Sequence, residues 1–240
     1  MICLIVGISL VGYIAYKFLG KKVGIALGGI LGGLISSTAT TVTDARKSAN
    51  GPGAVRVATI VVQIASAIVF ARVLLVIRVI SPTLFAAAER PLLIMMVLMA
   101  VLALVVWFWG RREQDQMPSQ ENPSELKGAL LFGLVFAMVL LATAGAKARF
   151  GQGGLYIVAV LSGLTDTDMD AITVSTAQLV NSYRLVPETG WRLVLVAALA
   201  NLVFKGAVVM FLGHRQLLAS IGTLYGVGLI VGTLLLWTSK

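Results

Sequence analysis

The chain has 240 residues, of which 58% are hydrophobic and only 12% are charged. Its mean hydropathy of +0.96 lies far above the range of soluble domains, so the composition excludes a soluble globular protein and indicates an integral membrane protein. The net charge of +9 comes largely from basic residues in pairs at the ends of apolar segments, where such residues anchor helices and contact anionic lipid headgroups. This placement argues against a nucleic-acid partner.

Apolar segments follow one another along the chain, and several have the length of about 20 residues that crosses the hydrocarbon core. They lie at residues 1–19, 23–35, 55–80, 91–109, 128–146, 154–164, 190–213 and 217–237. The first has no basic leading region and no small-residue cleavage site, so we expect a retained helix rather than a signal peptide. The sequence therefore predicts an all-α integral membrane protein with about eight transmembrane segments.

The two halves of the chain resemble each other when one is shifted by 130 residues. Gly33 then aligns with Gly163, and Thr43 aligns with Thr173. A hydrophilic stretch with two prolines separates the halves and is typical of a linker. The predicted parts are a first membrane repeat, a hydrophilic linker and a second membrane repeat, at residues 1–110, 111–125 and 126–240.

The second and sixth segments each carry a polar run at the matching place in their half. Residues 36–41 read Ser-Ser-Thr-Ala-Thr-Thr, and residues 165–170 read Thr-Asp-Thr-Asp-Met-Asp. Duplicated halves with interrupted helices 2 and 6 indicate a transporter with a binding site near the middle of the bilayer. The halves are parallel if both segments span the membrane and inverted if both turn back. The loop charges divide too evenly to decide between these topologies.

Three carboxylates, those of Asp166, Asp168 and Asp170, lie within five residues of an otherwise apolar stretch. An Asp near the bilayer centre costs roughly 2.5–3.5 kcal/mol, so water, a cation or protein groups must surround these residues. Side chains two residues apart share one side only in extended backbone, so the three carboxylates converge only if this segment unwinds. Hard oxygen ligands of this kind suit Mg²⁺, Ca²⁺ or Mn²⁺. The alternative is that the Asp residues cap a helix at an aqueous end.

Other polar residues are candidates for a substrate pathway. Arg72 and Lys205 hold nearly equivalent places in the two halves, where each balances a carboxylate, repels a cation from a wrong exit or snorkels to an interface. Asn201 is more typical of an interhelical hydrogen bond than of a ligand. The pathway candidates are Ser36, Ser37, Thr38, Thr40, Thr41, Thr165, Thr167, Thr173, Asp44, Arg72, Asn201 and Lys205.

The numbers and spacing of the remaining reactive residues argue against an enzyme. One cysteine, Cys3, allows no internal disulfide, and with one histidine, His214, a Cys/His zinc site is not expected. The chain also lacks the well-separated carboxylates of an intramembrane aspartyl protease and the basic phosphate ligands of a lipid transferase. We therefore predict no enzyme and no cofactor.

Glycines at helical spacing favour close packing between helices, within one subunit or between subunits. The rows comprise Gly20, Gly24, Gly28 and Gly32, then Gly29 and Gly33, and in the last segment Gly222, Gly226, Gly228 and Gly232. We expect a homo-oligomer through these faces, with a dimer favoured.

Three motifs are informative together: Val11-Gly12-Tyr13, the run from Gly32 to Thr41, and the run from Ser162 to Thr173. They resemble the membrane family DUF4010, whose domain is often fused behind an MgtC/SapB-like domain, and the likeness covers nearly the whole chain. The resemblance implies a multi-pass protein of the bacterial or archaeal inner membrane. The association of the fused domain with magnesium homeostasis favours divalent cations by analogy.

These observations predict a transporter or channel for a divalent cation, most of all Mg²⁺. Asp166, Asp168 and Asp170 are the expected metal ligands, and residues 36–41 complete the site from the other half. One alternative is a Na⁺- or H⁺-coupled transporter in which hydroxyls, Arg72 and Lys205 hold a small anion. Another is a non-transporting assembly or regulatory subunit. The expected partners are the lipid bilayer, a small inorganic ion and a second copy of the chain.

Overall fold

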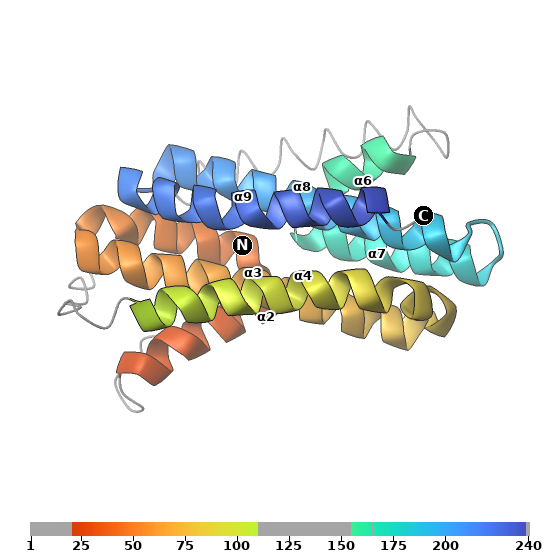
Figure 1. The fold of residues 1–240 in the computed structure, drawn as a ribbon, viewed down its shortest axis with the longest axis horizontal. Helices are drawn as coiled ribbons and strands as arrows, with labels where there is room; N and C mark the ends of the chain where they lie inside the picture. Colours follow the sequence, from red (N-terminus) through yellow and green to blue (C-terminus); the bar gives the residue numbers. More distant parts are fainter. Residues whose placement is uncertain (1–20, 110–154, 165, 239–240) are drawn as a thin grey trace. The chain divides into compact units, whose positions relative to one another are not determined.

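The computed structural model describes residues 21–109, 155–164 and 166–238, and within these ranges the protein is all-helical (Figure 1). The elements are α2 (Lys21–Lys47), η1 (Ser48–Asn50), α3 (Pro52–Ile80), α4 (Pro82–Trp109), α6 (Leu155–Gly163), α7 (Asp166–Asn181), α8 (Pro187–Leu212) and α9 (Arg215–Thr238). The prediction of an all-α protein is confirmed for this part of the chain.

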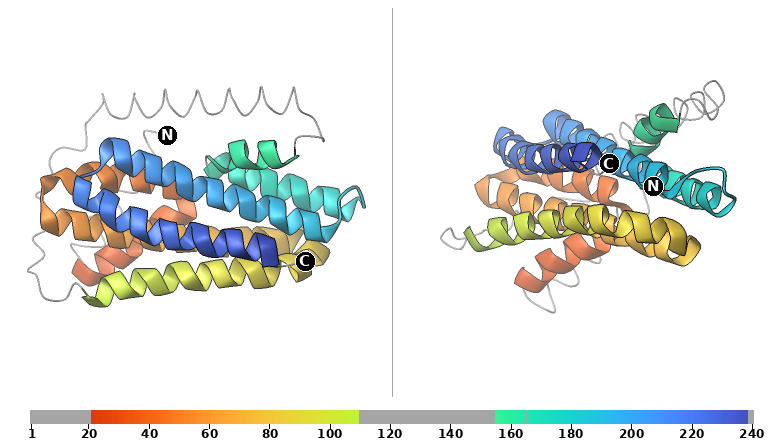
Figure 2. Two further views of the ribbon diagram at one scale, coloured as in Figure 1. Left: turned by 45° about the horizontal axis from the view of Figure 1, so that its top comes forward. Right: turned by 45° about the vertical axis from the view of Figure 1, so that its right-hand side comes forward.

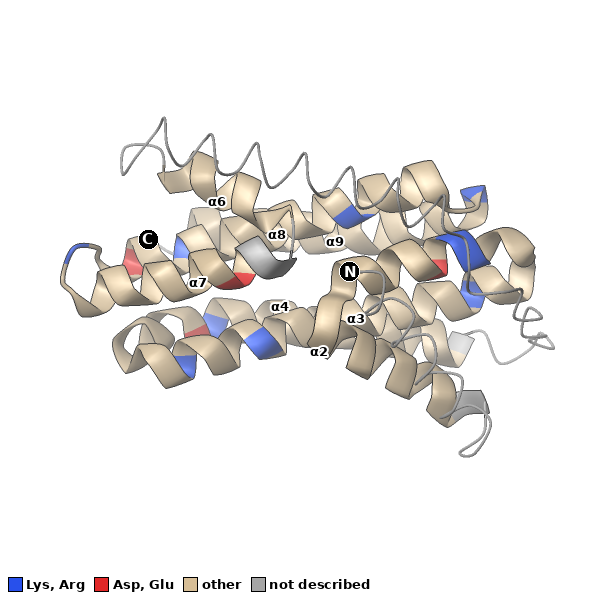
Figure 3. Ribbon diagram, turned by 180° about the vertical axis from the view of Figure 1, so that it is seen from behind, with Lys and Arg blue, Asp and Glu red and all other residues tan. Residues whose placement is uncertain are grey.

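Five helical stretches among the described residues are long and apolar enough to cross a membrane, which indicates a multi-pass membrane protein. They are Val23–Asn50, Pro52–Ile80, Pro82–Phe108, Pro187–Leu212 and Arg215–Thr238. Charged residues are sparse along these helices (Figure 3). The predicted segments at 1–19 and 128–146 lie outside the described residues, so the count of eight spans stays a prediction.

Local sequence signals fix where the long helices begin and end. Helices α3, α4 and α8 each start with proline, which suits the first helical position because no N–H is left unpaired there. The Ser81 hydroxyl caps α4 by accepting a hydrogen bond from the Leu84 N–H at 3.2 Å. Beyond α7, Tyr183 has a positive φ of 57°, and the Arg184 N–H donates to the Leu179 carbonyl at 2.9 Å. This is the left-handed turn that commonly ends helices.

The described residues form two compact groups, here called unit 1 and unit 2. Unit 1 contains residues 21–69, 98–109 and 205–225, and unit 2 contains residues 70–97, 155–164, 166–204 and 226–238. Helix α2 belongs to unit 1, and α6 and α7 belong to unit 2. Helices α3, α4, α8 and α9 contribute to both units, and each unit is described by itself.

Glycines bring α2 close to α3 within unit 1. A Cβ added at Gly29 would lie 2.7 Å from the Ile64 Cβ, and one added at Gly33 would lie 2.8 Å from the Ala65 carbonyl oxygen. Only glycine fits at this separation, as expected for small-residue packing faces. At Gly28 none of the described residues lies within 4 Å of an added Cβ, so the other glycine row does not contact this part of the chain at that point.

Candidate functional site

The first helix break lies at Ser36, inside the polar run of α2. Ser36 has extended backbone angles, φ −163° and ψ 105°, between two helical arms. A Cβ added at Gly32 would lie 2.8 Å from the Thr40 Cγ2 atom, although positions eight residues apart in a straight helix are separated by about 12 Å along the axis. Helix α2 therefore folds back on itself at Ser36, as its two arms in Figure 1 show.

The second arm of α2 begins with a capped and buried N-terminus. The Ala39 N–H donates a hydrogen bond to the Ser36 Oγ at 3.2 Å, which makes Ser36 the N-cap. The hydroxyls of Thr40 and Thr41 donate to the carbonyls of Ser36 and Ser37 at 2.9 and 2.8 Å. Because each hydroxyl proton is already donated, the two hydroxyl oxygens can only accept a hydrogen bond or ligate a cation. The predicted pathway residues buried here are Ser36, Ser37, Thr38, Thr40 and Thr41.

The second break separates α6 from α7 in unit 2. Helix α6 ends at Gly163 and α7 begins at Asp166, and the two helices contact each other while running in opposite directions (Figures 1 and 2). With nine residues, α6 is about 14 Å long, too short to cross a bilayer. A Cβ at Gly163 would lie 2.8 Å from the backbone of Ala197 in α8, so only glycine fits there. This break, like the first, turns the chain back.

The Asp-rich segment is helical from Asp166 onward rather than unwound. Helix α7 includes positions 166, 168 and 170, and helix geometry puts 166 and 170 one turn apart on one face and 168 on another. The backbone of α7 is therefore not the extended one in which alternate positions share one side. Acidic residues in a first turn interact favourably with the helix dipole, which gives a physical reason for the helix. Thr165 and the side chains of Asp166, Thr167 and Asp168 lie outside the described residues.

Asp170 forms an ion pair with Arg72 of α3 inside unit 2. Arg72 Nη2 lies 3.3 Å from Asp170 Oδ1, with the arginine side chain 13% exposed and the aspartate side chain 39% exposed. Arg72 lies well inside the candidate span Pro52–Ile80, where an arginine needs a partner of opposite charge. This contact agrees with the prediction that Arg72 balances a carboxylate.

Two further pathway candidates lie buried in unit 2. The Thr173 hydroxyl is fully buried and donates to the Met169 carbonyl at 2.8 Å. Asn201 of α8 is 1% exposed, and its amide nitrogen has no hydrogen-bond partner among the described residues. The interhelical hydrogen bond predicted for Asn201 is therefore not made by that nitrogen.

The remaining candidates belong to unit 1. Lys205 of α8 is fully buried within the candidate span Pro187–Leu212. Asp44 is half-buried near the end of α2, just before the basic pair Arg46 and Lys47. The described residues contain no group of three His, Cys, Asp or Glu side chains able to hold a metal. That residues 36–41 face the Asp segment stays a prediction.

Sequence reasoning missed a buried polar row on α3 in unit 1. The Ser66 and Tyr225 hydroxyls lie 2.7 Å apart, and Gln63 Nε2 lies 3.2 Å from the Met99 sulfur. Thr59, Gln63 and Ser66 are all buried. Their spacing of four and three residues inside an apolar helix is the signal that would have identified one polar face.

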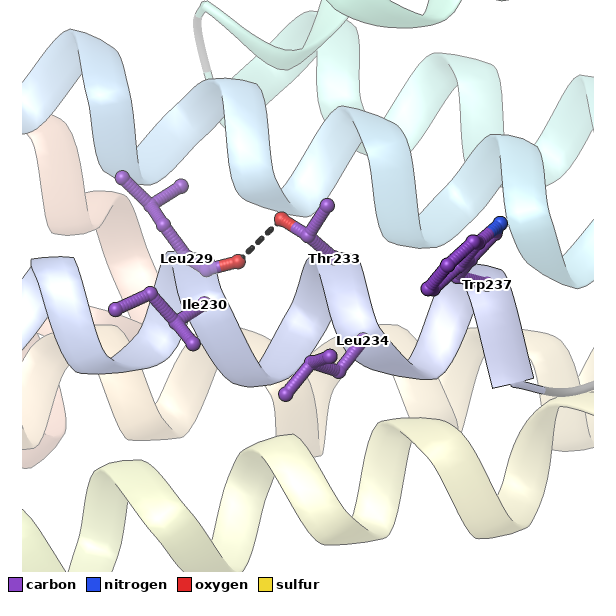
Figure 4. A pocket seen from close by; sticks show the side chains of 5 residues that line it. All are labelled: Leu229, Ile230, Thr233, Leu234 and Trp237. Atoms are coloured by element: carbon purple, nitrogen blue, oxygen red, sulfur yellow. Dashed lines mark hydrogen bonds between the residues drawn. The ribbon is translucent and has the colours of Figure 1, made fainter.

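An apolar groove runs along one face of α9, where Leu229, Ile230, Thr233, Leu234 and Trp237 line it (Figure 4). The Thr233 hydroxyl donates to the Leu229 carbonyl of its own helix, so the lining offers little polarity. Trp237 is 81% exposed at the helix end, the place of an interfacial anchor. The groove suits lipid chains rather than an ion.

Both helix breaks lie within the part of the chain that matches a known protein family. Residues 3–213 match the family described as a domain of unknown function, DUF4010. The chain belongs to the DUF4010 family. A curated relative of this DUF4010 protein, described as uncharacterized, comes from Aquifex aeolicus (strain VF5) and is 27% identical over 122 residues. That alignment covers 50% of this chain and 52% of the relative, so the chain spans about half the relative's length. No solved structure matches the DUF4010 chain.

Proposed function

We propose that this DUF4010 protein is a membrane transporter or channel for a divalent cation, with Mg²⁺ as the favoured ion and the bacterial or archaeal inner membrane as its location. The observation that carries the proposal is the chemistry at the two helix breaks. One break offers the Asp170 carboxylate, and both offer hydroxyl oxygens whose protons are already donated to their own helix. Oxygens of this kind accept but do not donate, which suits hard cations.

Helical geometry in α7 changes the expected ligand set. Positions 166 and 170 share one face of the helix, and Mg²⁺ is usually held by one or two carboxylates together with several waters. We therefore assign the ion to Asp166 and Asp170. Asp168, on another face, is left as a carrier of a proton or coupling ion.

We further propose that the two halves form inverted repeats. The chain folds back at both breaks. Three membrane crossings then separate equivalent positions of the two halves, and an odd number of crossings inverts one half relative to the other. In unit 1 the His214 N–H donates to the Ser48 Oγ at 2.9 Å, and in unit 2 Asn181 Nδ2 donates to the Ile80 carbonyl at 2.8 Å. Ser48 and Asn181 are 133 positions apart, and Ile80 and His214 are 134 positions apart. Both contacts join the end of a broken helix to the turn of a helical hairpin, which supports the duplication.

A second candidate function, coupled transport of a small anion, is favoured by Lys205. Its ammonium group is fully buried in unit 1, the unit that also holds the capped N-terminus of the second α2 arm. Helix N-termini and buried cations both attract anions. In this alternative the α7 carboxylates bind Na⁺ or H⁺.

Ligand-dependent thermal stability of the purified protein separates the two functions. The cation proposal predicts that Mg²⁺ or Mn²⁺ raises the midpoint of unfolding and that Asp170→Asn removes most of this rise. Ser175→Ala serves as control because Ser175 is exposed on the same helix. Stabilisation by phosphate or carboxylate anions, with none by divalent cations, would replace the cation proposal by the anion one.

A further inference from the structure

The hydroxyl of Ser162 differs from those of five other buried serines and threonines in helices. Those of Thr40, Thr41, Thr59, Ser66 and Thr173 donate to the carbonyl four residues earlier in the same helix. Ser162 is fully buried in the last turn of α6, yet its Oγ has no hydrogen-bond partner among the described residues. A buried hydroxyl without a hydrogen-bond partner is unfavourable, so this position calls for an occupant.

A second buried polar group belongs to the helix that packs against this end of α6. Gly163, next to Ser162, contacts the backbone of Ala197, and Asn201 follows one turn further along α8. The Asn201 amide nitrogen also has no hydrogen-bond partner in the described part of the chain. A flip of the amide exchanges its nitrogen and oxygen, so Asn201 is able to present an oxygen ligand one helical turn from the Gly163 contact.

Electrostatics at the end of α6 favour a cation. The last carbonyls of a helix have no partner within it, and they carry the negative end of the helix dipole. At this end of α6 the Leu161 carbonyl accepts the Leu164 N–H at 3.3 Å. Ser162 and Gly163 are the last two residues of α6, so their carbonyls belong to this end of the helix. Carbonyls at the C-terminal ends of broken helices are known ligands for coupling ions.

We infer that Ser162, Asn201 and the carbonyl end of α6 form a site for a monovalent cation, with Na⁺ as the ion. The ligands are neutral oxygens, and neutral oxygens suit a singly charged ion, whereas Mg²⁺ and Ca²⁺ sites in proteins recruit carboxylates. The site shares no residue with the Asp166 and Asp170 pair assigned above to the divalent cation. It adds a coupling ion to the proposed transport but does not depend on the identity of the transported ion.

The test measures thermal unfolding of the full chain in NaCl, KCl or choline chloride at constant ionic strength, with EDTA present to remove divalent cations. The wild type is expected to gain stability with Na⁺ alone. In Ser162→Ala and Asn201→Leu the Na⁺ concentration for half-maximal stabilisation is expected to rise at least about tenfold. Asn201→Asp keeps an oxygen ligand and is expected to retain the Na⁺ response. Ser175→Ala is the matched control and is expected to behave as the wild type.

Three outcomes would overturn the inference. One is a wild-type protein whose stability does not distinguish Na⁺ from choline, which would indicate a buried water in place of an ion. Another is an unchanged Na⁺ response in both Ser162→Ala and Asn201→Leu. The third is a loss of the response in Asn201→Asp equal to that in Asn201→Leu, which would indicate a packing role. Because EDTA removes divalent cations, none of these results bears on divalent transport.

Discussion

Gly32 lies against the side chain of Thr40, eight residues further along α2. No straight helix permits this contact, because the two positions would be about 12 Å apart along the axis. The contact exists because Ser36 adopts extended backbone angles and its hydroxyl restarts the helix as an N-cap. One polar residue thus converts a sequence of spanning length into a segment that folds back.

Folding back at both breaks predicts that two helical turns lie on opposite sides of the membrane. Thr83, after the α3–α4 turn, and Gln216, after the α8–α9 turn, are both exposed, and they lie 133 positions apart. Single cysteines at these positions, on a Cys3→Ser background, are expected to react with a membrane-impermeant thiol reagent from opposite sides of sealed vesicles. Labelling of both from the same side would indicate parallel repeats.

Gly163 and Gly222 form a matched pair for testing the packing of α6. Gly163→Ala places a methyl group against the Ala197 backbone, which cannot move aside as a flexible side chain would. We expect a loss of about 1–3 kcal/mol of stability, the usual cost of overpacking. Gly222→Ala meets nothing within 4 Å, and helix propensity predicts a gain of up to about 1 kcal/mol. Equal effects of the two substitutions on the free energy of unfolding would contradict this packing.

The Arg72–Asp170 ion pair predicts non-additive effects of mutation. Removal of either charge breaks this ion pair, so Arg72→Gln and Asp170→Asn are each expected to destabilise the protein, and the double substitution to cost less than the sum of the two. The expected coupling is about 1 kcal/mol, because the carboxylate is partly exposed. A cycle of thermal or denaturant unfolding measures it. Additive losses would mean that the two side chains do not interact in the protein.

The Ser36 cap predicts a local stability effect at the first break. Ser36→Ala removes the acceptor for the Ala39 N–H and is expected to cost about 1 kcal/mol, while Ser36→Asn is expected to keep most of the stability. Ser220→Ala is a suitable control, since the Ser220 hydroxyl only donates to Gln216 of its own exposed helix face. If Ser36→Ala and Ser220→Ala shift the unfolding midpoint equally, Ser36 is not a cap.

Much of the fold follows from the lengths of the apolar segments and from the residues that end them. The runs at 55–80, 190–213 and 217–237 correspond closely to α3, α8 and α9, because prolines and polar turns bound them. The two polar runs in the sequence indicate where the helices break. They do not indicate the backbone conformation at the breaks. Alternating Asp residues suggested extended backbone, whereas carboxylates in a first helical turn are stabilised by the dipole and leave the helix intact.

Long-range partners could not be predicted from the sequence. Arg72 had an expected carboxylate partner, yet its choice of Asp170 depends on how α7 packs against α3 in unit 2. The importance of Ser162 was hidden for a related reason. A serine in an apolar helix normally bonds to its own backbone, and only the coordinates show that this one does not.

The proposed oligomer stays a prediction. Among the described residues, nothing lies within 4 Å of a Cβ added at Gly222 or Gly226 of α9, so this row does not pack against the described part of the chain. Light scattering of the detergent-solubilised protein would give the number of subunits.

Cation uptake into liposomes tests the central claim most directly. Purified protein is reconstituted, and entry of Mg²⁺ is followed with an enclosed fluorescent indicator for the wild type, Asp170→Asn, Asp168→Asn and the control Ser175→Ala. The account predicts saturable uptake by the wild type and the control, a loss of at least about tenfold in Asp170→Asn, and a smaller loss in Asp168→Asn. Wild-type uptake no faster than in empty liposomes, or uptake by Asp170→Asn equal to the wild type, would contradict it.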